Sequence, residues 1–409
     1  MVDGTDHGTL MGRLARTAVR TGVRLRHGQE LVVHAPVAAA PLARLVAREA
    51  YAAGAPVVTV LWTDDDVSLA RFEAGGDGAF DASTPWLFDG LARAYADGAA
   101  VLSLRGEDPF LLSGQDAGKV GRANRSRAAA YKPVMDVLIG FGTNWGIVPS
   151  ATPAWARAVY PGLPEGEALE RLWSDLFDAC RVRGEDPVAD WAAHNAELDV
   201  RRAALDGARY TALRFRGPGT DLTVGLADGH QWHGGETRTA DGHRCNANIP
   251  TEEIYTAPDR LRVDGHATSS RPLSYAGTLV RDIRVRFEGG RIIESSASAG
   301  GEVLERLLGT DEGASRLGEV ALVPASSPIA RSGRLFYNTL LDENAASHVA
   351  VGMAYPNTLG GGDAEDRGAR GGNASSIHVD WMIGSADMDV DGIREDGSSV
   401  PVMRGGEWA

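Results

Sequence analysis

The first half of the chain alternates between two spacings of apolar residues. Residues 10–25 and 40–55 place apolar side chains three to four positions apart, which is typical of amphipathic helices. Residues 28–36 and 56–65 are short apolar runs of the kind found in buried strands, and 88–108 repeats the order helix, glycine, strand. Because strands that alternate with such helices form parallel sheets, we expect an α/β fold with helices on both faces of the sheet.

The pattern changes after Gly207. Two further helices are predicted just before this residue, whereas short alternating runs separated by glycine turns follow it. Residues 278–298 predict a β-hairpin, because two runs of alternating apolar and polar residues meet there at a Gly-Gly pair. We therefore predict two domains, an N-terminal α/β domain with a parallel sheet at 1–207 and a C-terminal β-rich (α+β) domain at 208–409.

The stretch SSIHVDWMIG, close to the C-terminal end, brings two polar groups together on a predicted strand. Ile377, Val379 and Trp381 share one face, since residues two apart in a strand point the same way. His378 and Asp380 share the other face. The pattern predicts a half-buried strand that presents an imidazole and a carboxylate side by side.

Charge and cysteine content narrow the classes of function. The 409 residues include 41 Lys and Arg against 55 Asp and Glu, a formal net charge of −14. No stretch concentrates basic residues, so neither a nucleic-acid partner nor an anionic membrane surface is expected. Cys180 and Cys245 lie far apart, which argues against a disulfide framework and against a thiolate zinc site. The N-terminus lacks the apolar run of a signal peptide, and no window resembles a membrane span, so we expect a cytoplasmic protein.

A Gly-rich and charged segment, 359–376, directly precedes His378. One interpretation is a surface loop without a role. The other is a mobile segment beside a functional site, since loops next to sites often carry function.

Acidic residues and histidines also occur among apolar neighbours elsewhere in the second half of the chain. Glu252 and Glu253 stand between a proline and Ile-Tyr, and Glu319 directly precedes an apolar run. His348 is flanked by small and apolar residues. Taken singly, each of these side chains has an ordinary explanation as a surface charge, an ion-paired group or a hydrogen-bonded core residue.

The combination of these residues predicts a metal site. Two imidazoles and several carboxylates would be costly to bury unpaired, and a divalent cation relieves that cost. Five such ligands exceed what one catalytic zinc ion takes while it keeps a position open, but they suit two ions bridged by a carboxylate and a water. The sequence contains no HExxH, GxSxG, GxGxxG or P-loop motif, so zincins, α/β-hydrolases and nucleotide sites of those types are not supported.

At these residues the sequence closely resembles the M29 family of thermophilic-type metallo-aminopeptidases. The resemblance spans nearly the whole chain and is most specific in NIPTEEIYTAP, GEVALVP, LDENAASHVAVGMAYP and HVDWMIG. The metal ligands that it implies are Glu253, Glu319, His348, His378 and Asp380. The choice of Glu253 over Glu252 depends on this family pattern alone.

The resemblance also implies catalytic roles and an assembly. Tyr355 matches a tyrosine that assists the tetrahedral intermediate, and Glu319 is expected beside the bridging water as proton acceptor and donor. The family pattern implies an N-terminal α/β domain, a C-terminal catalytic domain, and a homodimer whose active sites face an internal cavity. We expect two divalent ions (zinc, cobalt, manganese or magnesium) and a peptide substrate with a free N-terminus, whose amine could meet Glu252.

Two alternative functions follow from the same residues. His348, His378 and Asp380 are also a two-histidine, one-carboxylate set, as in a mononuclear non-haem iron ring-cleaving dioxygenase. Glu253 and Glu319 argue against it, because two further carboxylates would overfill such a site. A non-catalytic member of the fold is the other alternative, and the intact ligand set argues against that one.

Overall fold

The computed structural model describes residues 6–275 and 277–409, which form two compact units. The first contains the chain up to Ala193 together with Glu236–Pro250. The second contains His194–Gly235 and Thr251–Ala409. Helix α8 (Pro187–Ala208) is divided between them. The predicted domain limits, 1–207 and 208–409, stay a prediction.

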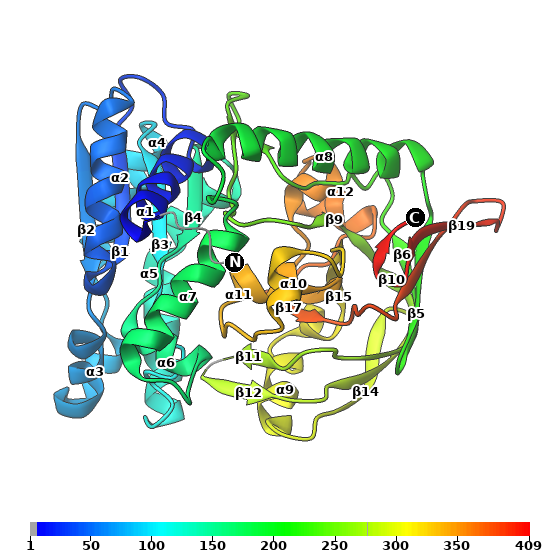
Figure 1. Cartoon of the computed structure of the whole chain (residues 1–409). Coiled ribbons are helices and arrows are strands. Elements are labelled where there is room, and N and C mark those ends of the chain that lie inside the picture. Colours follow the sequence, from blue (N-terminus) through cyan, green and yellow to red (C-terminus); the bar gives the residue numbers. More distant parts are fainter. Residues whose placement is uncertain (1–5, 276) are drawn as a thin grey trace. The chain divides into compact units, whose positions relative to one another are not determined.

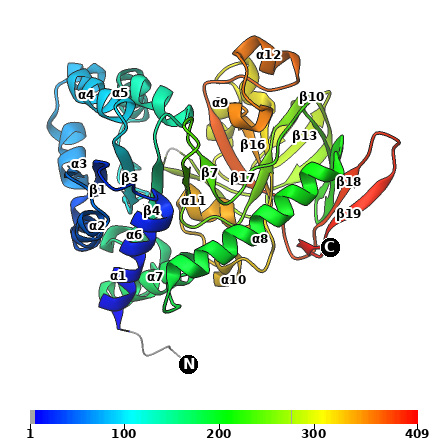
Figure 2. The ribbon, with the colours of Figure 1, turned by 90° about the horizontal axis from the view of Figure 1, so that it is seen from above.

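The first unit contains a four-stranded parallel sheet with the order β2-β1-β3-β4. The strands are β1 (Leu31–Pro36), β2 (Val58–Thr63), β3 (Ala100–Arg105) and β4 (Trp145–Pro149). Helices lie on both faces of this sheet (Figures 1 and 2), as the alternating pattern predicts. The helices of this unit are α1 (His7–Thr17), α2 (Ala40–Ala52), α3 (Asp65–Ala74), α4 (Pro85–Ala96), α5 (Ala117–Ile139), α6 (Pro153–Val159) and α7 (Glu165–Ala179).

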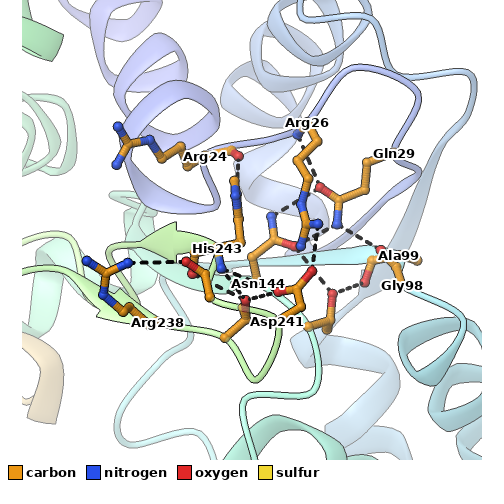
Figure 3. Close-up of polar contacts among 12 residues, drawn as sticks. Arg24, Arg26, Gln29, Gly98, Ala99, Asn144, Arg238, Asp241 and His243 are labelled. Carbon is orange, nitrogen blue, oxygen red and sulfur yellow. Dashed lines mark hydrogen bonds and ion pairs between the residues drawn. The ribbon is translucent and has the colours of Figure 1, made fainter.

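A short hairpin from the second half of the chain packs within the first unit. Strands β7 (Thr237–Arg238) and β8 (Arg244–Cys245) form it. Arg26 pairs with Asp241 at 2.7 Å, and His243 Nε2 lies 2.8 Å from the carbonyl oxygen of Arg24 (Figure 3). Nothing in the local sequence pattern predicts this placement.

The second unit is built from antiparallel sheets. An eight-stranded sheet has the order β14-β13-β10-β6-β5-β18-β19-β20. Its strands are β5 (Ala212–Gly217), β6 (Thr220–Leu226), β10 (Pro258–Thr268), β13 (Arg284–Glu288), β14 (Arg291–Ser296), β18 (Asp389–Ile393), β19 (Ser399–Arg404) and β20 (Glu407–Trp408). The predicted hairpin is confirmed, because β13 and β14 pair across Gly289-Gly290.

A four-stranded sheet, β17-β16-β15-β9, completes the core of this unit. Its strands are β9 (Ile254–Thr256), β15 (Leu317–Leu322), β16 (His348–Gly352) and β17 (His378–Met382). Side chains of both sheets share one apolar core, including Phe215 and Val263 from the larger sheet and Val320, Val349 and Trp381 from the smaller one. Smaller elements are β11 (Leu273–Tyr275), β12 (Thr278–Val280), α9 (Gly301–Leu308), α10 (Pro328–Ser332), α11 (Thr339–Asp342) and α12 (Ala364–Ala369).

These observations confirm the predicted fold class, an α/β part with a parallel sheet and a β-rich part. The Gly-rich segment 359–376 contains helix α12. Arg370, just after this helix, contacts the carboxylate of Asp366 at 2.7 Å and the carbonyl oxygen of Gly361 at 2.8 Å. Both cysteines are free and buried. In the described part of the chain, no helix has the length and apolar character needed to cross a bilayer.

Candidate metal centre

Three neighbouring strands bring predicted site residues to one face of the four-stranded sheet. Ala350, in β16, pairs with Glu319 of β15 on one side and with Asp380 of β17 on the other. His348 lies two residues from Ala350, and His378 lies two residues from Asp380. Because residues two apart in a strand share a face, all four polar side chains project from the same side of the sheet.

The opposite face of the same strands is apolar. Val320, Val349 and Trp381 lie on it and are buried in the core shared with the larger sheet. The predicted alternation in the last of these strands is therefore confirmed, with Trp381 inward and its two polar neighbours on the other face.

A β-bulge in β15 decides where Glu319 points. Leu317 pairs with Val351, but Glu319 pairs with Ala350, so Gly318 is an extra residue between two successive pairs. In a regular strand, Leu317 and Glu319 would share a face. Because of the bulge, Leu317 packs in the core while Glu319 projects from the polar face. Bulges often redirect a side chain in this way next to a functional site.

The polar side chains form two groups that share one member. His348 Nε2 lies 3.2 Å from Glu253 Oε2 and 3.5 Å from Glu319 Oε1. His378 Nε2 lies 3.8 Å from Glu319 Oε2 and 3.4 Å from Asp380 Oδ1. Each group offers three ligand atoms that all lie within 4.8 Å of one another. The structure thus brings together all five residues that the family pattern implies as ligands.

Backbone carbonyls orient both histidines. His348 Nδ1 lies 3.1 Å from the carbonyl oxygen of Ala346, and His378 Nδ1 lies 2.7 Å from that of Met353. Since a carbonyl oxygen only accepts, Nδ1 carries the proton in each neutral ring. The lone pair of each Nε2 therefore points at the carboxylates, which is the tautomer that metal-binding histidines use.

Such an arrangement fits a bound cation. His348 Nε2 and Asp380 Oδ1 are buried, and neither atom makes a hydrogen bond to any other described residue. Lone pairs that face carboxylate oxygens at these distances repel each other unless a proton or a cation lies between them. Imidazole nitrogens and carboxylate oxygens are ligands for zinc, cobalt and manganese, so the residues present suit divalent metal.

The pKa values of the same groups show how strongly they interact. Burial alone would lower the pKa of His378, but Asp380 and Glu319 outweigh it and raise the pKa to about 9. Burial likewise opposes protonation of His348, yet Glu253 and Glu319 raise its pKa well above the usual value. Burial raises the pKa of Glu319 to about 7, against the opposing effect of the two histidines. Without a cation, the cluster therefore holds protons near neutral pH.

Glu252 and Glu253 face different partners. The carboxylate of Glu253 contacts His348, whereas Glu252 Oε2 lies 3.9 Å from His194 Nε2, in helix α8. Both carboxylates are buried. The two neighbouring acids, which the sequence alone could not distinguish, thus contact different histidines. The choice of Glu253 as a metal ligand stays a prediction.

Tyr355 lies at the edge of the cluster. Its ring centroid is 4.4 Å from that of His378, with an angle of 42° between the ring planes. Burial and the nearby carboxylates of Asp380 and Glu319 raise the pKa of its hydroxyl well above the usual value, so the phenol stays protonated. The side chain is therefore a hydrogen-bond donor next to the ligand atoms.

Sequence reasoning missed one carboxylate of the site, Glu343. Burial raises its pKa well above the usual value, and Glu253 and Asp380 add to this effect because they lie close. The available signal was its position in LDENAASH, where an acid precedes His348 by five residues. Its neighbours in the sequence, Asp342 and Asn344, are also polar, so the local pattern does not distinguish Glu343 from a surface acid.

Comparison with known proteins finds a family model and relatives that match nearly the whole chain. A family model described as thermophilic metalloprotease (M29) matches residues 9–408. Aminopeptidase T of Thermus thermophilus is 52% identical over 399 residues, which cover 97% of each chain. Aminopeptidase 2 of Geobacillus stearothermophilus is 39% identical over 402 residues, which cover 98% of this chain and 97% of that protein.

A solved structure is also similar. The structure described as wild-type AmpT from Thermus thermophilus has a TM-score of 0.94 and 51% sequence identity. The match covers 98% of this chain and 99% of that chain. The likeness therefore includes both units and the strands that carry the ligand groups.

Proposed function

Because the chain belongs to the M29 family of metalloproteases, we propose that it is an aminopeptidase that removes the N-terminal residue of peptides. The names of its relatives, aminopeptidase T and aminopeptidase 2, support this activity. We further propose that two divalent cations act together in one site. The proposed ligands are Glu253, Glu319, His348, His378 and Asp380.

One observation carries the dinuclear proposal: Glu319 belongs to both ligand groups. Its Oε1 faces His348 and its Oε2 faces His378, so the two oxygens of one carboxylate point at different histidines. A carboxylate placed in this way would serve as a ligand in both groups if two cations were bound. A mononuclear site would leave one of the two groups without a cation.

The proposed reaction is hydrolysis of the first peptide bond. Divalent cations held by these ligands would supply Lewis-acid chemistry: they would polarise a carbonyl group and lower the pKa of a water toward neutral pH. Glu319 accepts the proton of the attacking water and returns it to the leaving amine. Tyr355 donates a hydrogen bond to the oxygen on which negative charge develops, a contact worth about 3 kcal/mol in comparable sites.

Recognition of a free N-terminus completes the proposal. Glu252 is the predicted partner of the substrate α-amine, and its Oε2 lies 3.9 Å from His194 Nε2. We also propose that the protein is a homodimer, as the family resemblance implies, and light scattering would measure its mass in solution. The comparisons give no support to the alternative of an iron dioxygenase.

The test is metal removal combined with a matched pair of substrates. Dialysis against a chelator should abolish the release of nitroaniline from aminoacyl-nitroanilides, and zinc or cobalt should restore it. The same substrate with an acetylated amine should stay intact throughout. Metal analysis of the active protein should give two ions per chain. Activity that survives complete metal removal, or equal cleavage of the acetylated substrate, would contradict the proposal.

A further inference from the structure

Asn344 occupies a buried position between the chain segments that carry two carboxylates of the site. It lies in a short 3-10 helix, Glu343–Ala345, which leads from α11 into β16. Its side chain is fully buried. It directly follows Glu343, and the segment that carries Glu253 packs against it.

All polar groups of the Asn344 side chain are engaged. Its Oδ1 accepts a hydrogen bond from the backbone N–H of Glu252 at 2.6 Å. Its Nδ2 donates to the carbonyl oxygen of Leu340 at 2.9 Å and to Glu343 Oε1 at 3.5 Å. Its own backbone carbonyl accepts from the hydroxyl of Ser327 at 2.9 Å. Since an N–H only donates and a carbonyl only accepts, these partners fix the orientation of the amide.

The bond to Glu252 matters because of what lies next to it. Glu253 precedes strand β9, which begins at Ile254, so its backbone lies outside the strand pairing of the described residues. The amide of Asn344 ties the chain one residue before Glu253. It thereby joins the segment that bears Glu253 to the loop that bears Glu343.

We propose that Asn344 is a positioning residue that holds the carboxylate of Glu253 at the distance from His348 that a cation requires. This inference rests on the proposed role of Glu253 as a metal ligand. Groups that orient metal ligands in this way commonly contribute 10- to 100-fold to metal affinity. Removal of the amide also breaks the hydrogen bond that the buried backbone N–H of Glu252 donates, so the segment loses this attachment.

Two substitutions of Asn344 and a matched control test this role. Asn344→Ala removes all three side-chain bonds. Asn344→Asp keeps an acceptor for the N–H of Glu252, but it loses the donor to Leu340 and Glu343 and adds a negative charge beside Glu343. The control is Asn144→Ala in the first unit. That asparagine is equally buried, and its amide donates to the carbonyl oxygen of Val23 at 2.5 Å. Its Oδ1 accepts a hydrogen bond from Gln29 at 2.6 Å (Figure 3).

The measurement is zinc affinity, by competition with a chelator, together with the thermal midpoint of the metal-free protein. Asn344→Ala should weaken zinc binding about 10- to 100-fold. Asn344→Asp should stay closer to the unchanged protein in zinc affinity, because it keeps the bond to Glu252 and its negative charge does not repel a cation. The same charge, next to Glu343, should lower the thermal midpoint of the metal-free protein. Asn144→Ala should lower the thermal midpoint without a change in zinc affinity. Unchanged zinc affinity in Asn344→Ala, or an equal loss in Asn344→Ala and Asn144→Ala, would overturn the inference.

These outcomes are independent of the aminopeptidase activity. If the unchanged protein binds zinc and does not cleave peptides, the proposed function fails while the comparison of affinities still stands. If Asn344→Ala does not fold, the comparison between Asn344→Asp and the unchanged protein decides, because a loss of 10-fold or more in a variant that retains the acceptor contradicts the proposed bond.

Discussion

Gly318 lies so close to Gly352 that a Cβ atom at position 318 would stand 2.3 Å from the carbonyl oxygen of Gly352. A second carbonyl oxygen, that of Met353, would lie 2.4 Å away. Backbone atoms of a paired strand cannot withdraw as a flexible side chain can. The bulge that turns Glu319 toward the ligand cluster therefore requires glycine at this position.

Gly318→Ala should disrupt the bulge and thereby the direction of Glu319. We expect a loss of zinc binding and a lower thermal midpoint, because the added methyl group must displace the backbone of the neighbouring strand. Gly12→Ala is the matched control. Gly12 lies within α1, and its added Cβ would have no neighbour within 4 Å, so this variant should be neutral or slightly more stable. Normal zinc binding by Gly318→Ala would show that the bulge does not determine the direction of the Glu319 side chain.

Glu319→Gln should remove both the proposed bridge and the proposed proton acceptor. Peptide hydrolysis should fall by at least ~10³-fold, as is common when a group central to the chemistry is lost. Metal analysis should show fewer than two ions per chain, while circular dichroism should match that of the unchanged protein. A variant that keeps two ions and near-normal turnover would remove Glu319 from the mechanism.

Tyr355→Phe should lower kcat more than it changes KM, since the hydroxyl is proposed to act where charge develops. The expected loss is on the order of 10²-fold to 10³-fold. Metal content should be unchanged, because the phenol is not a proposed ligand. A change confined to KM would instead indicate a role in binding the substrate.

Metal binding should release protons. The pKa of His378 is about 9 in the metal-free protein, because the carboxylates of Asp380 and Glu319 favour its charged form over the effect of burial. A cation must displace that proton below pH 9, so zinc affinity should rise with pH and level off above about 9 for this group. Calorimetry in buffers of different ionisation enthalpy, at pH 7.5, measures the protons released. Zinc binding without proton release would contradict this picture of the site.

His34 should make the stability of the first unit depend on pH. Burial, with contributions from Arg105 and Arg127, lowers its pKa to about 4 from an ordinary value of 6.5, and its Nε2 lies 2.6 Å from the hydroxyl oxygen of Tyr95. A depressed pKa in the folded state means that the unfolded chain takes up the proton first. The contribution of His34 is therefore present above pH 6.5 and is lost as the pH falls toward 4.

The expected size of this effect is about 3 kcal/mol between pH 7 and pH 4. His34→Gln cannot titrate in this range, so its stability should fall less steeply than that of the unchanged protein. Urea unfolding monitored at several pH values measures the difference. Parallel pH profiles for the two proteins would show that the imidazole titrates normally in the folded state.

Much of the architecture follows from local patterns. The alternation of helices and strands along the chain predicts the parallel sheet. Apolar residues at every second position predict the hairpin at 278–298 and the buried face of β17. These features are predictable because periodicity reports which side of an element is buried. The resemblance to the M29 family also names the five residues that the structure brings together.

Other features depend on contacts between distant parts of the chain. A period of two places Leu317 and Glu319 on one face, and only pairing with β16 reveals the bulge that separates them. The sequence cannot distinguish Glu252 from Glu253, because both are glutamates in the same local context. In the folded chain they contact different histidines, His194 and His348. Glu343 and Asn344 belong to the site only because the segment that contains Glu252 and Glu253 packs against them.

The sequence by itself determined which stretches form helices and strands and which face of each is apolar, since these depend on residues a few positions apart. Only the tertiary structure decided which polar side chains meet, because strand register and a single extra residue in β15 set their positions. A cluster of ligand atoms is a property of several strands at once, and no one strand encodes it.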